Sequence, residues 1–337
     1  MIETICRIVF WVCIGLYAYI LIGHGLLLAF LSLFFKKPVK KKNITPHVCF
    51  IIPAYNEERL IEMKIQNTLE LDYPADKLEI VIVSDASSDR TDEIVRKHSH
   101  KNKRIKLLRQ QCRQGRTNAI NLAFEKNKTE IFAISDADIM LKKTALTELV
   151  ANFTDPTVGA ATARFIGLET GPKAGNHNYW GYEQLMRHLE SSIFSVSFIS
   201  GALNALRSEH VGKSPPDVTH DHYTPAYIAQ KGLRTIYEPL AIAYETYERS
   251  HRKEFAIGER TLLMGINFMR DFPRILDVCR HPWFIFNLLF RKILRWFSPL
   301  FLLISWIASL FIITEPCPLA YIILTGLGLL FMVLYVA

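Results

Sequence analysis

The stretch Glu130-Ile-Phe-Ala-Ile-Ser-Asp-Ala-Asp138 indicates the fold class of this chain. It is a short, strongly apolar run that ends on two carboxylates, which is the pattern of a buried strand followed by a polar turn. Upstream, similar apolar runs alternate with segments of helical spacing. The expected strands are 48–55, 78–83, 105–109 and 130–135, and the expected helices are 57–71, 91–98, 116–125 and 141–153. This alternation predicts an α/β fold, a mostly parallel sheet with helices on both faces.

The later half of the central region has a mixed pattern. Residues 158–166 and 235–244 are expected as strands, 179–194 as a helix, and 199–207 as a strand or a tight loop. The chain contains no GxGxxG and no GxxxxGK[ST] segment. A dinucleotide fingerprint and a P-loop are therefore excluded as the source of its chemistry.

Polar clusters follow three of the expected strands, at the point where each strand ends. In open α/β sheets, ligands bind outside the carboxyl ends of the strands. We therefore expect the three clusters to converge on one crevice. They are Tyr55-Asn56-Glu57, the turn from Asp85 to Asp89, and Asp136-Ala137-Asp138.

Four residues of these clusters and the next helix are candidates for binding a divalent cation, a nucleoside or a diphosphate. Asp136 and Asp138 could together hold a divalent cation and leave room for phosphate oxygens, as Mg²⁺ sites do, although DxD spacing is also common in solvated turns. Asp85 is suited to accept a hydrogen bond from a base or ribose; the alternative is a turn or N-cap aspartate. Arg116 is suited to a diphosphate as a bidentate donor; the alternative is a surface arginine.

Asp221, in Thr219-His220-Asp221-His222, is the candidate general base for a hydroxyl nucleophile. The two flanking histidines raise a zinc site as an alternative. We disfavour it because no third well-spaced ligand is evident and flanking histidines are often structural. The six cysteines are scattered and form no CxxC pair, so free thiols are expected.

The ends of the chain carry its apolar excess. Of 337 residues, 50% are hydrophobic and 21% are charged, and residues 8–35, 297–314 and 316–337 contain no Asp, Glu, Lys or Arg. Roughly 20 apolar residues span a hydrocarbon core, so we expect one transmembrane helix in 1–35 and two in 297–337. The alternative is a pair of buried core helices. A simple soluble protein and a pure membrane bundle are both excluded, because about 240 central residues are globular in composition.

Basic flanks orient these segments. The stretch from Lys36 to Lys42 is rich in lysine. Three basic residues, Arg291, Lys292 and Arg295, precede the second apolar run. Short basic flanks stay on the cytoplasmic side, so residues 36–280 are expected as a cytoplasmic domain of a multi-pass cell-membrane protein. Residues 281–296 are expected as an interfacial helix, with a packed surface helix as the alternative. The net charge of +8 is attributed to lysines facing anionic headgroups of the lipid bilayer, and no nucleic-acid partner is expected.

An ordered set of motifs resembles the membrane-embedded family 2 glycosyltransferases, which are related to hyaluronan, cellulose and poly-N-acetylglucosamine synthases. The resemblance covers nearly the whole chain. In chain order, the matching segments are Phe50-Ile-Ile-Pro-Ala-Tyr-Asn-Glu57, Val83-Ser-Asp-Ala-Ser-Ser-Asp89, Gln114-Gly-Arg-Thr-Asn-Ala-Ile-Asn121, Ser135-Asp-Ala-Asp138, Gly201-Ala-Leu-Asn-Ala-Leu-Arg207, His220-Asp221 and Lys292-Ile-Leu-Arg-Trp-Phe-Ser-Pro299.

The resemblance implies a Rossmann-like GT-A fold flanked by transmembrane helices. It implies an inverting transfer from a nucleotide-diphospho sugar, with UDP expected, to a glycan or lipid-linked acceptor, and Mg²⁺ or Mn²⁺ as cofactor. The product would be a polysaccharide or a cell-surface glycan. The implied roles are Asp221 as catalytic base, Asp138 and Asp136 as metal ligands, Arg207 and Arg260 on the acceptor side, and Pro53, Tyr55, Glu57, Asp85, Arg116 and Asp136 as nucleotide-sugar contacts.

Two departures from the family pattern keep other functions open. His220 stands where the family has an acidic residue before its base. Polymerising members carry (Q/R)xxRW, and this chain keeps Arg260 but has Ile257 and Thr261 at the other two positions. Transfer of a single sugar to a lipid carrier is therefore a second hypothesis. A third hypothesis is a non-catalytic membrane scaffold or export component. The presence of all four candidate carboxylates disfavours it; they are Asp85, Asp136, Asp138 and Asp221.

Overall fold

The computed structural model describes residues 2–167, 176–245, 251–275, 277, 280–312, 319, 321–323 and 325–328. The chain divides into two compact units. One is the continuous segment Phe35–Phe284, and the other combines Met1–Phe34 with Ile285–Ala337. The larger unit contains every strand of the described residues.

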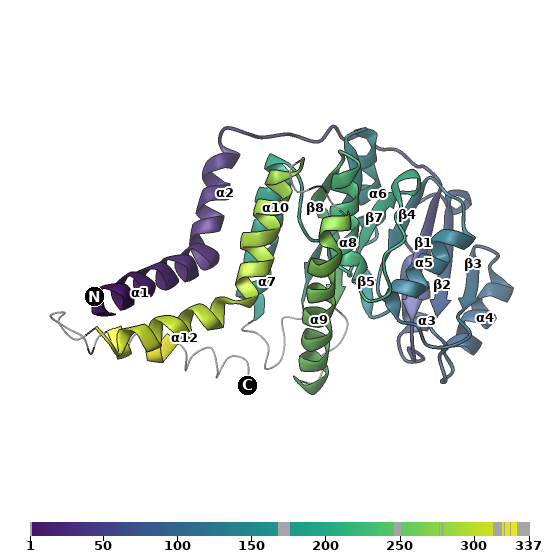
Figure 1. The fold of residues 1–337 in the computed structure, drawn as a ribbon. Helices are drawn as coiled ribbons and strands as arrows, with labels where there is room; N and C mark the ends of the chain where they lie inside the picture. Colours follow the sequence, from purple (N-terminus) through teal and green to yellow (C-terminus); the bar gives the residue numbers. More distant parts are fainter. Residues whose placement is uncertain are drawn as a thin grey trace. The chain divides into compact units, whose positions relative to one another are not determined.

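The larger unit is built on a single eight-stranded sheet with the strand order β3-β2-β1-β4-β7-β6-β8-β5 (Figure 1). The strands are β1 (Val48–Ala54), β2 (Leu78–Ser84), β3 (Ile105–Arg109), β4 (Ile131–Ile134), β5 (Ile139–Leu141), β6 (Val158–Ile166), β7 (Asn204–Arg207) and β8 (Arg234–Glu245).

The sheet is mostly parallel, as expected, and it is mixed because two strands, β7 and β5, run in the opposite direction to the others. β3, β2, β1 and β4 run parallel, as their alternation with helices predicts. β7 is antiparallel to both β4 and β6, and β5 is antiparallel to β8, while β6 and β8 are parallel. Hydrophobic patterning identifies a strand but does not set the direction of its partner, so the later strands could not be oriented from sequence.

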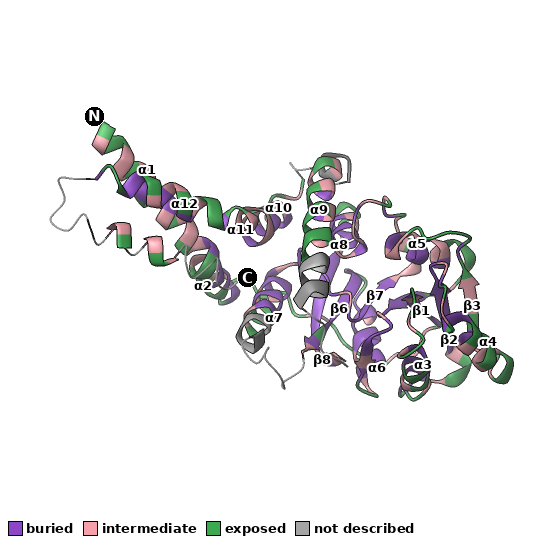
Figure 2. Ribbon diagram, turned by 90° about the horizontal axis from the view of Figure 1, so that it is seen from below, coloured by how far each residue is buried: buried purple, intermediate pink, exposed green. Residues whose placement is uncertain are grey.

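Helices cover both faces of the sheet, as expected. Along β1, Phe50 and Ile52 face one layer and Cys49 and Ile51 face the other, because successive side chains of a strand alternate. The first layer contains α3 (Ile61–Leu69), α4 (Thr91–Lys101) and α6 (Ala145–Val150), and the second contains α5 (Arg116–Lys126) and α8 (His220–Gln230). Figure 2 shows the buried strands between these helices.

Two predicted helices begin later than expected. The helix expected from residue 57 begins at Ile61, because Asn56 adopts a left-handed φ of 56° and the Glu57 carbonyl accepts hydrogen bonds from the Leu60 and Ile61 amides. The helix expected from residue 141 is α6, which begins at Ala145 after the short strand β5. The segment 199–207 forms strand β7 only at its end, and the helix expected at 179–194 is α7 (Asn176–Ile193).

The smaller unit contains the apolar ends. α1 (Ile2–Ala18), a π-helical turn (Tyr19–Gly23) and α2 (His24–Ser32) form one run of 31 residues, which is long and apolar enough to cross a membrane. A signal sequence near an N-terminus passes the same test. α12 (Ser298–Ser309) is apolar but shorter, and most of the second predicted C-terminal span lies outside the described residues. The segment expected as an interfacial helix is helical as α10 (Pro282–Leu288), a π-helical turn (Leu289–Ile293) and α11 (Leu294–Trp296).

The basic segment after α2 is part of the larger unit and is bonded to its other elements. The Lys37 amide donates to the Ser192 carbonyl at 2.8 Å, and the Lys40 amide donates to Asp155 Oδ2 at 3.2 Å. The Lys41 ammonium pairs with the carboxylate of Glu238, which is fully buried and also accepts a hydrogen bond from Asn152. One lysine of the predicted membrane-facing block therefore neutralises an internal charge.

We expect Lys41→Met to lower the free energy of unfolding by about 3 kcal/mol, because the Glu238 carboxylate would stay buried without this cation. Urea unfolding followed by circular dichroism measures the effect. Lys42→Met is the matched control, since the neighbouring Lys42 side chain is exposed and lies in the same lysine-rich stretch. Equal unfolding free energies for the two variants would contradict this account.

Candidate active site

The polar clusters of three strands meet at one edge of the sheet. β2, β1 and β4 are neighbours, with Ala54 paired to Ser84 and Ile51 paired to Ile134. The Asp85 amide donates to the Ala54 carbonyl at 2.9 Å, and the Ser135 amide donates to the Ile51 carbonyl at 3.1 Å. The predicted convergence of the three strand ends is confirmed.

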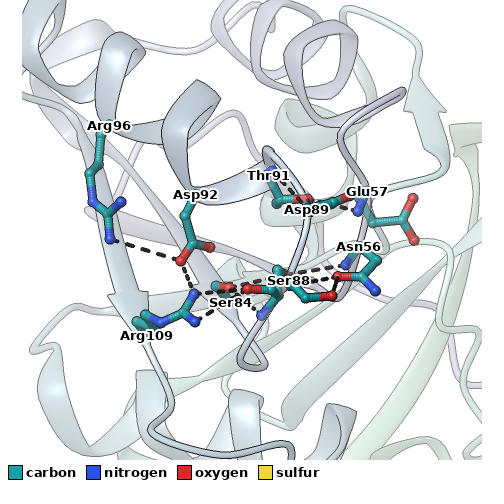
Figure 3. Close-up of polar contacts among 10 residues, drawn as sticks. Asn56, Glu57, Ser84, Ser88, Asp89, Thr91, Asp92, Arg96 and Arg109 are labelled. Carbon is teal, nitrogen blue, oxygen red and sulfur yellow. Dashed lines mark hydrogen bonds and ion pairs between the residues drawn. The ribbon is translucent and has the colours of Figure 1, made fainter.

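A hydrogen-bonded turn network joins the ends of β1 and β2 (Figure 3). Asn56 Oδ1 accepts from the Ser88 amide at 2.9 Å, and the Glu57 amide donates to Thr91 Oγ1 at 2.8 Å. Asp89 accepts from both the amide and the hydroxyl of Thr91, which is the first residue of α4. These bonds hold the first two polar clusters in a fixed geometry.

Asp85 holds the loop that precedes α5. Its two carboxylate oxygens accept from the backbone amides of Gln114 at 2.7 Å and Gly115 at 2.9 Å, and the residue is 4% exposed. Gly115 has a φ of +88°, a left-handed conformation that favours glycine. Asp85 thereby fixes the position of Arg116, the first residue of α5. The predicted contact of Asp85 with the nucleotide stays a prediction.

Tyr55 lies beside this loop at the edge of the site. The Arg113 guanidinium stacks on its ring, with Cζ 4.0 Å from the ring centroid. Both side chains are solvent-exposed, as a surface for a planar base requires. The neighbouring Pro53 is paired with Val83 inside the sheet and is partly buried. Arg113 was not among the residues predicted from sequence.

Arg116 bridges two of the predicted carboxylates. Its Nε donates to Asp136 Oδ1 at 2.7 Å, and its Nη1 lies 3.4 Å from Asp221 Oδ1. Burial opposes the charge on Arg116, but the two carboxylates outweigh it and raise the pKa of the guanidinium. Burial raises the pKa of the Asp221 carboxyl, against the opposing charge of Arg116. The donor-side and base-side candidates thus form one charge cluster.

Gly201, in the loop before β7, lies against the charge cluster. A Cβ at this position would lie 2.9 Å from Asp136 Oδ2, 3.1 Å from Arg116 Nη2 and 3.4 Å from Asp221 Oδ2. A side chain at this position would displace the Asp136 carboxylate and crowd the Arg116 guanidinium. The glycine was noticed in the sequence as part of a motif, but its contact with the carboxylates depends on the fold.

The residues present fit a Mg²⁺ or Mn²⁺ ion that is completed by substrate. Asp136 and the buried Asp138 offer carboxylate oxygens on one short loop. No group of three or more His, Cys, Asp or Glu side chains that could hold a metal occurs within the described residues. Mg²⁺ typically binds through one or two carboxylates plus substrate phosphates, and this donor set matches that habit.

Asp221 lies in the first turn of α8, where a carboxylate is favoured by the helix dipole. The adjacent His220 is buried against the Phe124 ring, and burial, with the charge of Arg116, lowers the pKa of its imidazole to about 3. His222 lies instead between the rings of Phe198 and Phe268. The two histidines have separate aromatic surroundings, an arrangement that gives no support to the zinc alternative.

The two predicted acceptor-side arginines are not part of this cluster. Arg207 is paired with Ile131 at the opposite end of β4, and its guanidinium donates to the carbonyls of Phe153, Asp155 and Val158. These bonds give Arg207 a structural role, and its contact with an acceptor stays a prediction. Arg260 lies exposed on α9 (His251–Ile275), and its acceptor role stays a prediction.

Residues 49–211 match the family described as Glycosyl transferase family 2, a range that includes β1, β2, β4 and the bridging arginine. This match covers less than half of the chain and shows a family 2 glycosyltransferase domain within residues 49–211. Asp221 and α8 lie beyond the matched range.

Proteins similar to this chain include a polysaccharide synthase. It is 28% identical over 273 residues to the poly-beta-1,6-N-acetyl-D-glucosamine synthase of Staphylococcus aureus (strain COL), which covers 77% of this chain and 64% of the synthase. It is 36% identical over 124 residues to Probable glycosyltransferase YdaM of Bacillus subtilis (strain 168), covering 36% of this chain and 30% of YdaM. The chain thus matches less than two thirds of either relative.

A solved structure resembles this chain over nearly its whole length. The mannosyltransferase PcManGT from Pyrobaculum calidifontis, in complex with GDP-Man and Mn²⁺, superposes with a TM-score of 0.71 and 26% sequence identity. The match covers 98% of this chain and 92% of that one. This likeness confirms the expected GT-A type of α/β fold.

Proposed function

We propose that this chain is an inverting, metal-dependent glycosyltransferase that moves a sugar from a nucleotide-diphospho donor to a glycan acceptor at the cytoplasmic face of a membrane. The Arg116 bridge between Asp136 and Asp221 carries the proposal. It places a cation suited to a diphosphate next to a carboxylate suited to a hydroxyl proton, at the strand ends where α/β sheets bind ligands.

The chemistry assigned to these groups is a direct displacement at the anomeric carbon. The acceptor hydroxyl oxygen forms the new bond to that carbon, the bond to the diphosphate oxygen breaks, and Asp221 takes the hydroxyl proton. The sugar gains oxocarbenium character, by analogy with glycoside hydrolysis. Arg116 stabilises the charge on the leaving nucleoside diphosphate. A divalent ion held by Asp138 and Asp136 would supply Lewis-acid neutralisation of the same leaving group.

Membrane attachment and the kind of product are further parts of the proposal. The apolar run Ile2–Ser32 exposes large side chains such as Trp11, Leu26 and Phe30, which a lipid environment would cover. Similarity to a poly-N-acetylglucosamine synthase supports polysaccharide synthesis. Thr261, in place of the family tryptophan, favours single-sugar transfer to a lipid carrier as the second candidate. The gathered carboxylates favour both over a non-catalytic scaffold.

A donor panel tests the proposal. Membranes containing the protein are incubated with UDP-sugars and GDP-sugars, with Mn²⁺, Mg²⁺ or excess EDTA, and nucleoside diphosphate release and product size are measured. UDP is the expected nucleotide from the motif resemblance, and GDP-mannose is included because the similar mannosyltransferase binds it. A long product supports polymer synthesis, and a singly glycosylated lipid supports the second candidate. If no nucleoside diphosphate is released from any donor, the proposed sugar transfer is refuted. Full activity in excess EDTA would refute the metal dependence.

A further inference from the structure

Lys64 is a fully buried lysine inside the catalytic unit. It lies on α3, in the buried stripe that also contains Ile61, Ile65 and Thr68. A lysine is almost never fully buried without partners, because removing an ammonium group from water is costly. Its position therefore calls for a role that an apolar residue could not fill.

The Lys64 ammonium connects the two ends of the loop that carries Asp136 and Asp138. Nζ donates to Ser135 Oγ at 2.7 Å, just before the first aspartate, and to the Ile139 carbonyl at 2.5 Å, just after the second. Ser135 and Ile139 lie 71 and 75 positions after Lys64 in the sequence. One side chain thus closes the base of the carboxylate loop from the interior of the protein.

Ser135 extends this connection to the loop that contains Gly201 and Ala202. Its hydroxyl donates to the Ala202 carbonyl at 2.6 Å, and Ala202 follows Gly201, which lies against the carboxylates of Asp136 and Asp221. The hydrogen bonds of Ser135 with Lys64 and Ala202 therefore join the Asp136–Asp138 loop to the loop that contains Gly201. An amine keeps at least two N–H donors whether or not it is protonated, so both bonds persist in either state.

We propose that Lys64 is a positioning residue that holds the Asp136–Asp138 loop in the geometry needed to bind a divalent ion together with the donor diphosphate. This inference rests on the proposed function and names a residue which that function does not use. Lys64 touches neither donor nor metal in this account, and it acts through Ser135 and the Ile139 backbone. A loop released at its base would lose the preorganisation that makes two carboxylates an effective site.

Direct binding of Mn²⁺ tests the inference without relying on turnover. Free Mn²⁺ is measured by electron paramagnetic resonance, with purified protein and the nucleoside diphosphate of the donor identified in the panel. Lys64→Met, which matches the length of the side chain, is expected to weaken Mn²⁺ binding at least tenfold. Ser135→Ala, which buries no new group and keeps the lysine, is expected to weaken it at least threefold. The double variant is expected to bind no more weakly than Lys64→Met.

Thr68→Val is the matched control. Thr68 is fully buried one turn further along α3, and its hydroxyl donates within the helix to the Lys64 carbonyl, away from the carboxylate loop. We expect it to lower the melting temperature while leaving Mn²⁺ affinity within twofold of the wild type. In transfer assays, Lys64→Met should raise the Mn²⁺ concentration for half-maximal rate, with kcat at saturating Mn²⁺ within threefold.

The outcomes separate this inference from the proposed function. If Ser135→Ala binds Mn²⁺ as the wild type does, the loop connection is irrelevant and the inference is overturned, even if Lys64→Met does not fold. Equal affinities of Lys64→Met and wild type overturn it as well. If the wild type binds no Mn²⁺ with any nucleoside diphosphate and transfers no sugar, the proposed function itself fails.

Discussion

Asp221→Asn is expected to lower kcat for sugar transfer by about 10³-fold, while donor affinity stays within twofold of the wild type. A positioned general base typically contributes 10²–10⁴-fold, and an amide cannot take the hydroxyl proton. The substitution keeps the size of the side chain and its place in the first turn of α8. Initial rates of nucleoside diphosphate release and equilibrium donor binding measure the two quantities separately.

The matched control for the base is Asp217→Asn, four residues earlier. Asp217 is a more exposed aspartate whose Oδ2 pairs with Arg270 at 2.8 Å, outside the charge cluster. Because exposed ion pairs contribute little, its kcat should stay within twofold of the wild type. Undiminished turnover in Asp221→Asn would remove this residue from the mechanism. Equal losses in both variants would indicate a general effect of altering this region.

Arg116→Met is expected to lower kcat/KM for the donor at least 10²-fold and to move its acidic limb to higher pH. A missing charge-stabilising donor typically costs 10²–10³-fold in rate. The positive charge of Arg116 lowers the pKa of Asp221, whereas burial and Asp136 raise it. Without the arginine, Asp221 is protonated at a higher pH, and only its deprotonated form can act as the base. A pH profile of kcat/KM checks the direction.

Arg109→Met is the control for loss of an arginine near the site. Arg109 lies at the end of β3 and pairs with the buried Asp92, and it also donates to the Ser87 carbonyl. Its removal disturbs the turn network of Figure 3 without touching Asp136 or Asp221. We expect lower stability in Arg109→Met but an acidic limb at the wild-type pH. An unshifted limb in Arg116→Met would contradict the assigned coupling.

Much of the first half of the fold was predictable because its signals are local. The strands that end near Tyr55, Asp85 and Asp136 are continuous apolar runs, and polar residues mark their ends. Parallel order then places those ends at one edge of a sheet. The later strands have the same local signals, but their directions depend on partners such as β4 for β7, which no periodicity encodes.

Lys64 and Arg207 show which features of the site cannot be predicted from local sequence patterns. A lysine in the apolar stripe of α3, beside Ile61 and Ile65, was a signal that could have been noticed in sequence. Its partners, however, are set by the packing of α3 under the loop after β4. Arg207 has the residue type of a binding group, but the antiparallel register of β7 carries it to the opposite end of β4.

The sequence by itself determined the α/β class, the carboxylates at the strand ends and the apolar termini, because hydrophobic period and strand-end chemistry are properties of short segments. Only the tertiary structure decided which of these groups act together. Arg116 joins Asp136 and Asp221, which lie 20 and 105 residues away from it, beside Gly201, where a side chain would displace the Asp136 carboxylate. Such a cluster arises from sheet order and helix packing, and side-chain electrostatics take effect only once those have brought the charges together.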